Sequence, residues 1–295
     1  MIDDPAVNWL IDEPMLHEPV LVVMLTGWID AAGAGAAAAE AVSDGCNAAP
    51  IARFDDDTFI DFRARRPTLE LRDGLNTDLS WSTIELRSGR TPDGRDVLML
   101  LGPEPDMAWN RFGKVVADIA VDVGVTTMVG FGAYPFAAPH TRPSRLSVSS
   151  PSTDVLASVT FARSSVDVPA GMAAVLEHAL HARKVPALGI WAQVPHYVST
   201  MAYPAASVAL LEGLREATGV SISSEELERE VSGLRRRLDD TVAENSEHQS
   251  MLRQLEELYD ASDEPGETID DGPSLEMRSG DDLAAEIQQF LRDQD

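Results

Sequence analysis

Cysteine is almost absent from this sequence, since Cys46 is the only one in 295 residues. An intramolecular disulfide is therefore excluded, and no pair of cysteines is available to hold zinc. The apolar run at residues 20–25 is too short to cross a membrane. The acidic residues 1–4 are not followed by the apolar segment of an export signal. We therefore expect a cytoplasmic protein.

Basic residues are also scarce. Lys and Arg together number 23 against 49 Asp and Glu, which gives a formal net charge of −26. Nucleic acids and anionic membranes attract clustered Lys and Arg, and such clusters are limited here to residues 63–66 and 235–237. Neither a nucleic acid nor a membrane is therefore expected as a partner.

The motifs of several common catalytic sites are missing as well. The chain has no Gly-x-Ser-x-Gly, no His-Glu-x-x-His and no phosphate loop that ends in Gly-Lys-Ser/Thr. His178 and His181 have a spacing that metal ligands use. No third ligand is near them in the sequence, so both are expected to be exposed. No catalytic residue, metal site or cofactor site is assigned.

The chain is organised around residues 19–41, where an apolar strand at 20–25 is followed by Thr-Gly-Trp-Ile-Asp and an alanine-rich helix from residue 31. A continuous apolar strand is typical of a parallel sheet that is covered on both faces. Asp30 is predicted to cap the helix N-terminus. Two interpretations of Gly33 and Gly35 stay open. Either they let the helix pack closely on a neighbour, or they cradle a phosphate at the helix start.

Strand and helix patterns alternate up to residue 219. Strands are predicted at 20–25, 49–54, 81–86, 97–101, 125–131, 146–148, 155–161 and 187–192, and further helices at 109–123, 170–182 and 204–217. Thr-Pro-Asp-Gly at 91–94 predicts a turn between two antiparallel strands, and the three acids at 55–57 predict a solvated turn. The alternation predicts an α/β fold with a mainly parallel sheet and helices on both faces.

The last 75 residues differ in composition from the rest. They contain 22 acidic and 7 basic residues, a net charge of −15, which leaves −11 for the first 220. We expect an α/β core domain at 1–220 and a helical extension at 221–260, either one long helix or a hairpin that bends near Asn245. An acidic linker at 261–280 and an amphipathic helix at 281–295 complete the predicted organisation.

Candidate functional residues follow the predicted parallel strands. The carboxyl ends of parallel strands meet at one edge of a sheet, where ligands bind. The residues concerned are Asp30, Glu104, Asp106, His140, Arg142, His196 and Tyr197. If they converge, Arg142 can clamp a carboxylate or phosphate and a histidine can carry a proton. The alternative is that these groups bond to one another and fix the loops.

Four motifs carry a resemblance to a known family. They are Thr-Gly-Trp-Ile-Asp-Ala-Ala-Gly at 26–33, Gly-Pro-Glu-Pro at 102–105, Pro-His-Thr-Arg-Pro at 139–143 and Val-Pro-His-Tyr-Val at 194–198. In this order they resemble the motifs of the proteasome assembly chaperone 2 family, in its actinobacterial branch. The similarity covers about residues 20–219, and the helical extension and acidic tail also look like that branch.

The resemblance implies an architecture related to nucleoside phosphorylases and, in eukaryotic and archaeal relatives, a role in assembling proteasome α-rings. Those relatives use a C-terminal hydrophobic-Tyr-any tripeptide for docking. This chain ends Asp293, Gln294, Asp295 and departs from that pattern. The family has also been described as similar to ATP-grasp enzymes.

Two hypotheses of function follow. The first is a chaperone-like interaction protein whose partner is a proteasome subunit or another protein. The alternative is a small-ligand-binding protein or enzyme, ATP-grasp-like or nucleoside-phosphorylase-like, that uses the residues at the strand ends. A homo-oligomer is expected in either case, because the thin alanine-rich helix and the helical extension both offer packing surfaces.

Overall fold

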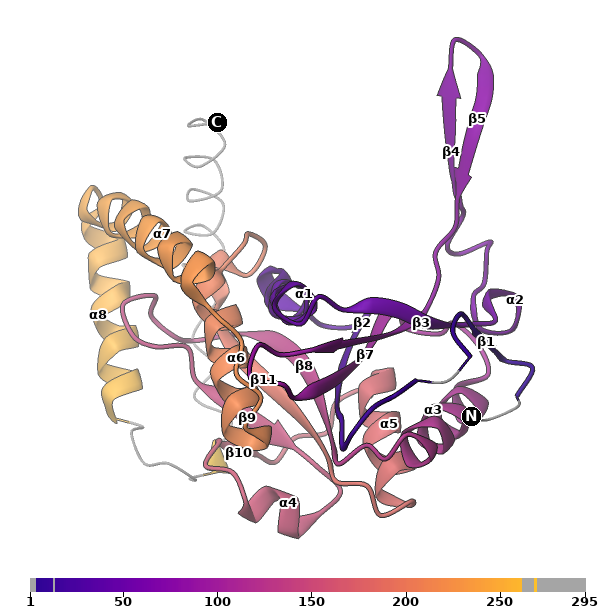
Figure 1. Cartoon of the computed structure of the whole chain (residues 1–295). Coiled ribbons are helices and arrows are strands. Elements are labelled where there is room, and N and C mark those ends of the chain that lie inside the picture. Colours follow the sequence, from indigo (N-terminus) through magenta and orange to yellow (C-terminus); the bar gives the residue numbers. More distant parts are fainter. Residues whose placement is uncertain (1–3, 13, 262–267, 270–295) are drawn as a thin grey trace.

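The computed structural model describes residues 4–12, 14–261 and 268–269 (Figure 1). The helices are α1 (Ala34–Gly45), α2 (Asp56–Phe59), α3 (Trp109–Asp122), α4 (Thr153–Ala157), α5 (Met172–His181), α6 (Pro204–Thr218), α7 (Glu225–Ala243) and α8 (Ser246–Ala261). The strands are β1 (Val7–Trp9), β2 (Val20–Thr26), β3 (Ala49–Phe54), β4 (Thr68–Arg72), β5 (Leu75–Ser80), β6 (Glu85–Arg90), β7 (Asp96–Pro103), β8 (Thr127–Phe136), β9 (Leu146–Ser149), β10 (Arg163–Ser164), β11 (Ala187–Pro195) and β12 (Thr268–Ile269). Short 3-10 turns occupy Ala31–Gly33 and His196–Val198.

Eight strands form the central sheet, in the order β1-β3-β6-β7-β2-β8-β11-β9. The four middle strands, β7, β2, β8 and β11, run parallel. Antiparallel strands extend the sheet on both sides. The predicted α/β fold is confirmed, and the antiparallel margins make the sheet a mixed one.

Strand β2 lies in the middle of the sheet because both of its faces are apolar. Val20, Val22 and Met24 belong to the core on one face of the sheet, and Leu21 and Val23 to the core on the other. Successive side chains of a strand point to opposite faces, so a continuous apolar run needs cover on both sides. The sequence-based prediction for this strand is correct.

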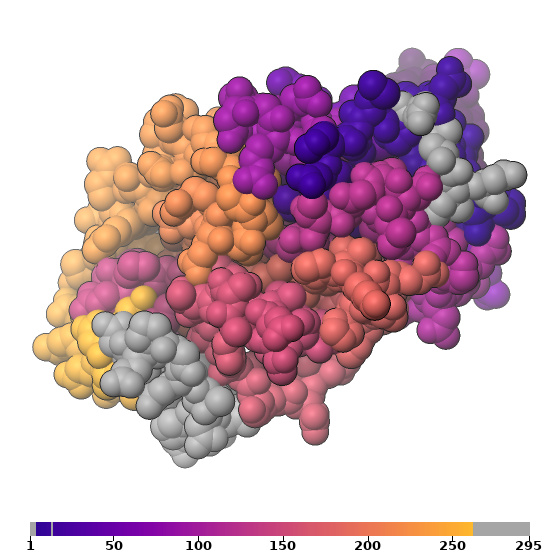
Figure 2. Space-filling view, turned by 60° about the horizontal axis from the view of Figure 1, so that its bottom comes forward, coloured from indigo at the N-terminus to yellow at the C-terminus, as the bar shows by residue number. Residues whose placement is uncertain are grey.

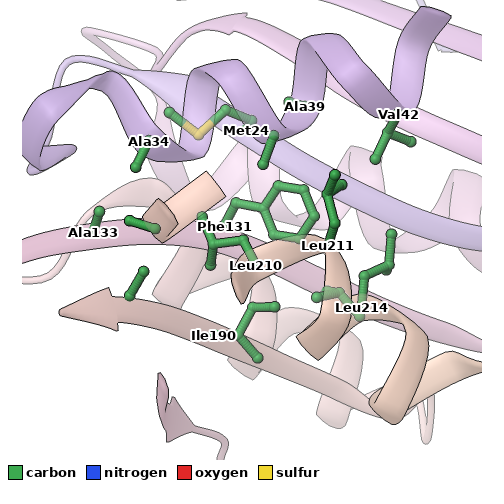
Figure 3. Packing of buried hydrophobic residues seen from close by; sticks show 14 of the residues in the cluster. Met24, Ala34, Ala39, Val42, Phe131, Ala133, Ile190, Leu210, Leu211 and Leu214 are labelled. Atoms are coloured by element: carbon green, nitrogen blue, oxygen red, sulfur yellow. The ribbon is translucent and has the colours of Figure 1, made fainter. Parts of the chain in front are cut away.

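Helix α1 covers one face of the sheet with small side chains. Ala34, Ala38 and Val42 are buried in the same core as residues of β2, β8 and α6, and the close-up shows Phe131 and Leu211 beside the helix (Figure 3). Since alanines add almost no width, larger side chains from the sheet and from α6 fill the space. Helices α3 and α5 cover the other face, where Phe112 packs 4.8 Å from Phe54 and 5.1 Å from Phe59 between ring centroids.

The helical extension forms two helices rather than one. The break between α7 and α8 falls at Asn245, whose side-chain oxygen accepts a hydrogen bond from the backbone N–H of Glu247 at 2.9 Å. Leu234, Leu238 and Leu255 join the core that contains α1 and α6. Both helices therefore pack on the body. They lie at the opposite end of the molecule from the indigo N-terminal residues (Figure 2).

Several predictions differ from the structure. Residues 55–57 lead into the one-turn helix α2, since acids are favourable at a helix N-terminus, and α1 begins at Ala34 after a 3-10 turn. The strand predicted at 81–86 is β6, which starts at Glu85 because Trp81 packs on Phe62 instead, with ring centroids 4.7 Å apart.

The strand predicted at 155–161 is also wrong, because its first residues form the helix α4. Ser152 caps this helix by accepting a hydrogen bond from the backbone N–H of Val155, and Asp154 lies in the first turn. These N-terminal signals outweigh the strand preference of the valines.

Most of the acidic linker and the whole C-terminal amphipathic helix lie outside the described residues. The exception is β12, which pairs with β10 in parallel. Within the part of the chain that the structure describes, no helix is long and apolar enough to span a bilayer.

Candidate functional site

Four adjacent parallel strands bring the four sequence motifs to one edge of the sheet, here called the rim. Residues 26–33 follow β2, residues 102–105 end β7, residues 139–143 follow β8 and residues 194–198 end β11. The register keeps these ends level, since Thr26 pairs with Pro103 and Pro195 with Phe136. Each candidate side chain then has its own set of partners.

Asp30 is used to cap α1. Its carboxylate accepts hydrogen bonds from the backbone N–H groups of Gly35 at 2.7 Å and Ala36 at 3.1 Å. Burial of the carboxylate raises the pKa of Asp30, and the two hydrogen bonds lower it. The effect of burial is the larger, so the pKa is raised. A phosphate at this helix start would need the same N–H groups. The close-packing interpretation of the glycines therefore accounts for the structure.

Glu104 and Asp106 hold other segments in place. Glu104 Oε2 accepts a hydrogen bond from the backbone N–H of Met172 at 3.1 Å, at the start of α5. Both carboxylate oxygens of Asp106 lie 3.1 Å from Arg65 Nε, and Asp106 also accepts from the backbone N–H of Asp61 at 3.0 Å. Arg65 thus belongs to the rim, as a partner of a nearby acid.

His140 and Tyr197 form a buried pair. The Tyr197 hydroxyl accepts from the backbone N–H of His140 and lies 2.8 Å from its Nδ1. The carboxylate of Asp239 can only accept, so Nε2, whose distance to Asp239 Oδ1 is 3.2 Å, carries the proton of the neutral imidazole, and Nδ1 accepts from the Tyr197 hydroxyl. Burial lowers the pKa of His140 and raises the pKa of Tyr197. Both side chains are therefore neutral near pH 7, and the ring of His196 packs edge-on against Tyr197.

Arg142 is bound to α8. Its Nε and Nη2 donate to the two carboxylate oxygens of Asp260 at 2.8 and 2.7 Å, and Nη1 donates to Glu256 at 3.2 Å. These acids raise the pKa of Arg142, and the guanidinium lowers the pKa of Asp260. A bidentate pair of this kind sets a defined geometry.

Two further contacts attach α8 to the same loop. The guanidinium carbon of Arg145 lies 3.6 Å from the ring centroid of Tyr259, and Arg145 Nη2 donates to the Tyr259 carbonyl at 2.8 Å. The Tyr259 hydroxyl donates to the Pro143 carbonyl at 3.0 Å. Residues 139–145 are thus the loop on which α8 is seated.

A family model for the PAC2 family matches residues 24–242. The chain belongs to the PAC2 family. A search of curated protein sequences finds no match.

Solved structures agree with this assignment. A Corynebacterium glutamicum protein of unknown function is 31% identical, with a TM-score of 0.80 over 88% of this chain and 98% of that one. A Mycobacterium tuberculosis proteasome-assembly chaperone homologue is 30% identical, with a TM-score of 0.73 over 79% of this chain and 99% of that one. A Pyrococcus furiosus archaeal proteasome activator is 15% identical, with a TM-score of 0.60 over 79% of this chain and 97% of that one, and shares the fold alone.

In this PAC2 protein the candidate residues have three different sets of partners. His140, Arg142 and Tyr197 lie with α7 and α8, Asp30 lies at α1, and Glu104 and Asp106 hold α5 and Arg65. Among residues 4–12, 14–261 and 268–269, no three His, Cys, Asp or Glu side chains lie close enough together to hold a metal ion.

Sequence reasoning missed the residues of α7 and α8 that contact this loop. They are Asp239, Glu256, Tyr259 and Asp260. The spacing of the last three was a usable signal, because residues three and four apart share one face of a helix. Glu256 and Asp260 are opposite in charge to Arg142, which donates to both of them.

A cavity of about 180 Å³ lies between the loop and α7. Its lining includes His140, Arg142, Tyr203 and Arg235, together with leucines of α7. Pockets for organic ligands usually measure about 300–1,000 Å³. This cavity is below that range and is too small for a nucleotide, although a cavity of about 150 Å³ can hold a molecule the size of benzene.

Replacing Arg142 by Gln is expected to loosen α8 without unfolding the body, because Gln cannot bridge Asp260 and Glu256. Amide hydrogens of residues 246–261 should exchange about five- to tenfold faster, and added salt should reduce the difference between wild type and variant, because salt screens the ion pairs of the wild type. Hydrogen exchange measured by mass spectrometry tests this. Arg111→Gln, which removes an exposed ion pair with Asp4, is the matched control. Equal exchange in both variants would show that Arg142 does not hold the helix.

Proposed function

We propose that this PAC2 protein is a chaperone-like interaction factor that binds proteasome subunits during assembly. The proposal is supported by family membership and by the names of similar structures, which include a proteasome-assembly chaperone homologue at 30% identity.

The observation that carries the proposal is the set of partners that the rim side chains bind. Asp30 and Glu104 bind backbone N–H groups at helix starts, and Asp106 binds Arg65. His140 and Arg142 bind acids of α7 and α8. Catalysis needs charged groups aimed at a common reacting atom. In the described chain these groups instead bind the helices α1, α5, α7 and α8 and the segment that contains Arg65, which supports a structural role for them.

No specific observation at the rim favours the alternative function, which is a ligand-binding protein or enzyme. The cavity beside His140 is smaller than a nucleotide needs. A thermal-shift screen with nucleotides, nucleosides and amino acids provides the comparison, since a ligand present at 100 times its Kd stabilises by about 2.7 kcal/mol. No shift is expected.

The direct test uses the full chain and purified proteasome α-subunits of the same organism. Native mass spectrometry should detect a complex between them, and the full chain should speed the formation of α-rings. An unrelated protein of similar size and negative charge is the control for a general charge effect. If the full chain neither binds the subunits nor changes their assembly rate, the proposed function is wrong.

A further inference from the structure

Five large apolar side chains at and beside the rim are 41–67% exposed. They are Trp28 and Ile29 after β2, Met107 after β7, and Val166 and Val168 between β10 and α5. Together they are called the apolar track. Single exposed apolar residues are ordinary on a protein surface, whereas a contiguous group of them indicates a binding surface.

Contacts join the members of the apolar track. A Cβ placed on Gly171 would lie 2.8 Å from Cδ1 of Trp28, so the indole lies directly on the Gly171 backbone. Both valines belong to the exposed segment 163–170 that leads to this glycine. The next residue, Met172, donates its backbone N–H to Glu104 at 3.1 Å, three residues before Met107. The track is therefore one continuous surface.

The basic loop at residues 63–66 borders the track. Arg65 Nη2 lies 3.0 Å from the position of a Cβ on Gly27, the residue before the exposed tryptophan. Arg65 Nε also binds Asp106, the residue before the exposed methionine, at 3.1 Å. The other two arginines of this loop are exposed. In a chain with a net charge of −26, an apolar surface beside arginines is complementary to an acidic and amphipathic partner.

The end of the same chain has this composition. Residues 281–295 contain five acidic residues and one basic residue, a net charge of −4. Leu283, Ile287, Phe290 and Leu291 recur at helical spacing, which predicts an amphipathic helix. A helix of this length is marginal in water without a surface to cover its apolar face. These residues lie beyond the described part of the chain.

The course of the chain brings this segment towards the track. Strand β12 pairs with β10 in parallel, with Ile269 opposite Ser164. The chain therefore leaves β12 in the direction that residues 165–171 take towards Trp28. Seven residues of chain separate Ser164 from Gly171, a span of at most about 25 Å. Residues 270–282 can extend over about 43 Å, which is enough to reach the whole track.

We propose that residues 281–295 dock as an amphipathic helix on the apolar track of their own chain. Their apolar face covers Trp28 and Val168, and their acids face the arginines of the basic loop. The contact closes an exposed surface at the rim. A molecule that uses this surface must first displace the segment.

Hydrogen exchange of the full chain, measured by mass spectrometry, tests the contact from the side of the track. Amides of residues 283–291 should be protected in the wild type. Val168→Ser should lower this protection about fivefold, because it removes an apolar contact. Val121→Ser, at a valine of α3 that is 48% exposed and outside the track, is the matched control. It should stay within about twofold of wild type.

Variants of the segment test the contact from the other side. Ile287→Ser with Phe290→Ser should speed exchange of residues 165–171 about fivefold or more, because the cover over these residues is lost. Gln288→Ser with Gln289→Ser makes the same change on the opposite face of the predicted helix and should have little effect. Thermal unfolding of all variants, followed by circular dichroism, should show that the body stays folded.

Photo-cross-linking locates the docked segment. With p-benzoylphenylalanine in place of Phe290, cross-links should form to residues 27–30, 105–108 or 165–171. The same group in place of Gln288 should give at least fivefold fewer of these cross-links. A mixture of isotopically light and heavy chains distinguishes links within one chain from links between two chains, and links within one chain are expected.

Four results would overturn the proposal. Unprotected amides at residues 283–291 of the wild type would mean that the segment is not docked. Equal losses in Val168→Ser and Val121→Ser would remove the track as its surface. Cross-links to α7, α8 or another surface would place the segment elsewhere, and links between light and heavy chains would place it on a second copy.

Discussion

Replacing Glu177 by Gln is expected to make this PAC2 protein more stable at pH 8 than the wild type, and to remove much of its loss of stability above pH 4.5. Glu177 lies on α5 and is only 4% exposed. Its contact in the core is Ser149, whose hydroxyl donates to Glu177 Oε1 at 3.1 Å. Burial without a positive partner raises the pKa of Glu177 from 4.5 to about 8.

The direction of the pH effect follows from proton uptake. In the unfolded chain Glu177 loses its proton near pH 4.5, whereas in the folded protein it keeps the proton up to about pH 8. Between these values the folded state binds more protons, so the free energy of unfolding falls as pH rises. From pH 4.5 to pH 7 the loss amounts to about 3 kcal/mol. Below pH 4.5 this contribution is fully present.

Urea unfolding at pH 5, 6, 7 and 8 measures the effect, through the difference in unfolding free energy between variant and wild type. Glu212→Gln on α6, an exposed glutamate, is the control for a change of one charge. The difference in unfolding free energy between Glu177→Gln and wild type should grow with pH. The difference between Glu212→Gln and wild type should stay nearly constant. Parallel curves for all three proteins would show that Glu177 is ionised in the folded state.

Replacing Gly102 by Ala is expected to destabilise the protein by about 3–5 kcal/mol, the sum of a strained backbone and a steric clash. Gly102 belongs to the Gly-Pro-Glu-Pro motif at the end of β7 and has a φ of 133°. A Cβ at this position would lie 2.5 Å from the carbonyl oxygen of Thr83 and 2.9 Å from the Cα of Ile84. Both are backbone atoms, so no side chain can move aside.

Gly94→Ala separates the two causes. Gly94 also has a positive φ, 92°, but a Cβ there would meet nothing within 4 Å. Gly94→Ala should lower the free energy of unfolding by about 1–2 kcal/mol, from the backbone conformation alone. Thermal and urea unfolding of both variants test the comparison. Similar losses of stability in Gly102→Ala and Gly94→Ala would mean that β6 and β7 separate easily at Gly102.

The position of the rim was predictable from the sequence, and so was the role of Asp30. Apolar strand patterns identified β2, β8 and β11, and parallel strands place their carboxyl ends on one edge. A carboxylate before an alanine-rich helix is a local cap signal. The structure confirms it, although α1 starts three residues later than predicted.

The hairpin formed by β4 and β5 was missed although its signal is local. Asp73 and Gly74 stand between two short segments that each contain two leucines, and an Asp-Gly pair in this position is a strong indication of a hairpin. The neighbouring arginines and acids made the segment look like a mixed surface loop. An exposed hairpin also has no buried face, so the usual contrast between core and solvent positions is absent.

The sequence by itself determined the four parallel strands β2, β7, β8 and β11, the helices that cover them, the two covered faces of β2 and the alignment of four motifs along one edge. These features depend on side-chain periodicity and caps, which act over a few residues. Only the tertiary structure decided which groups meet at that edge. Arg142 binds Asp260, 118 residues away, and His140 binds Asp239, 99 residues away. Such pairs depend on how the helical extension packs on the body, and no local pattern encodes that distance.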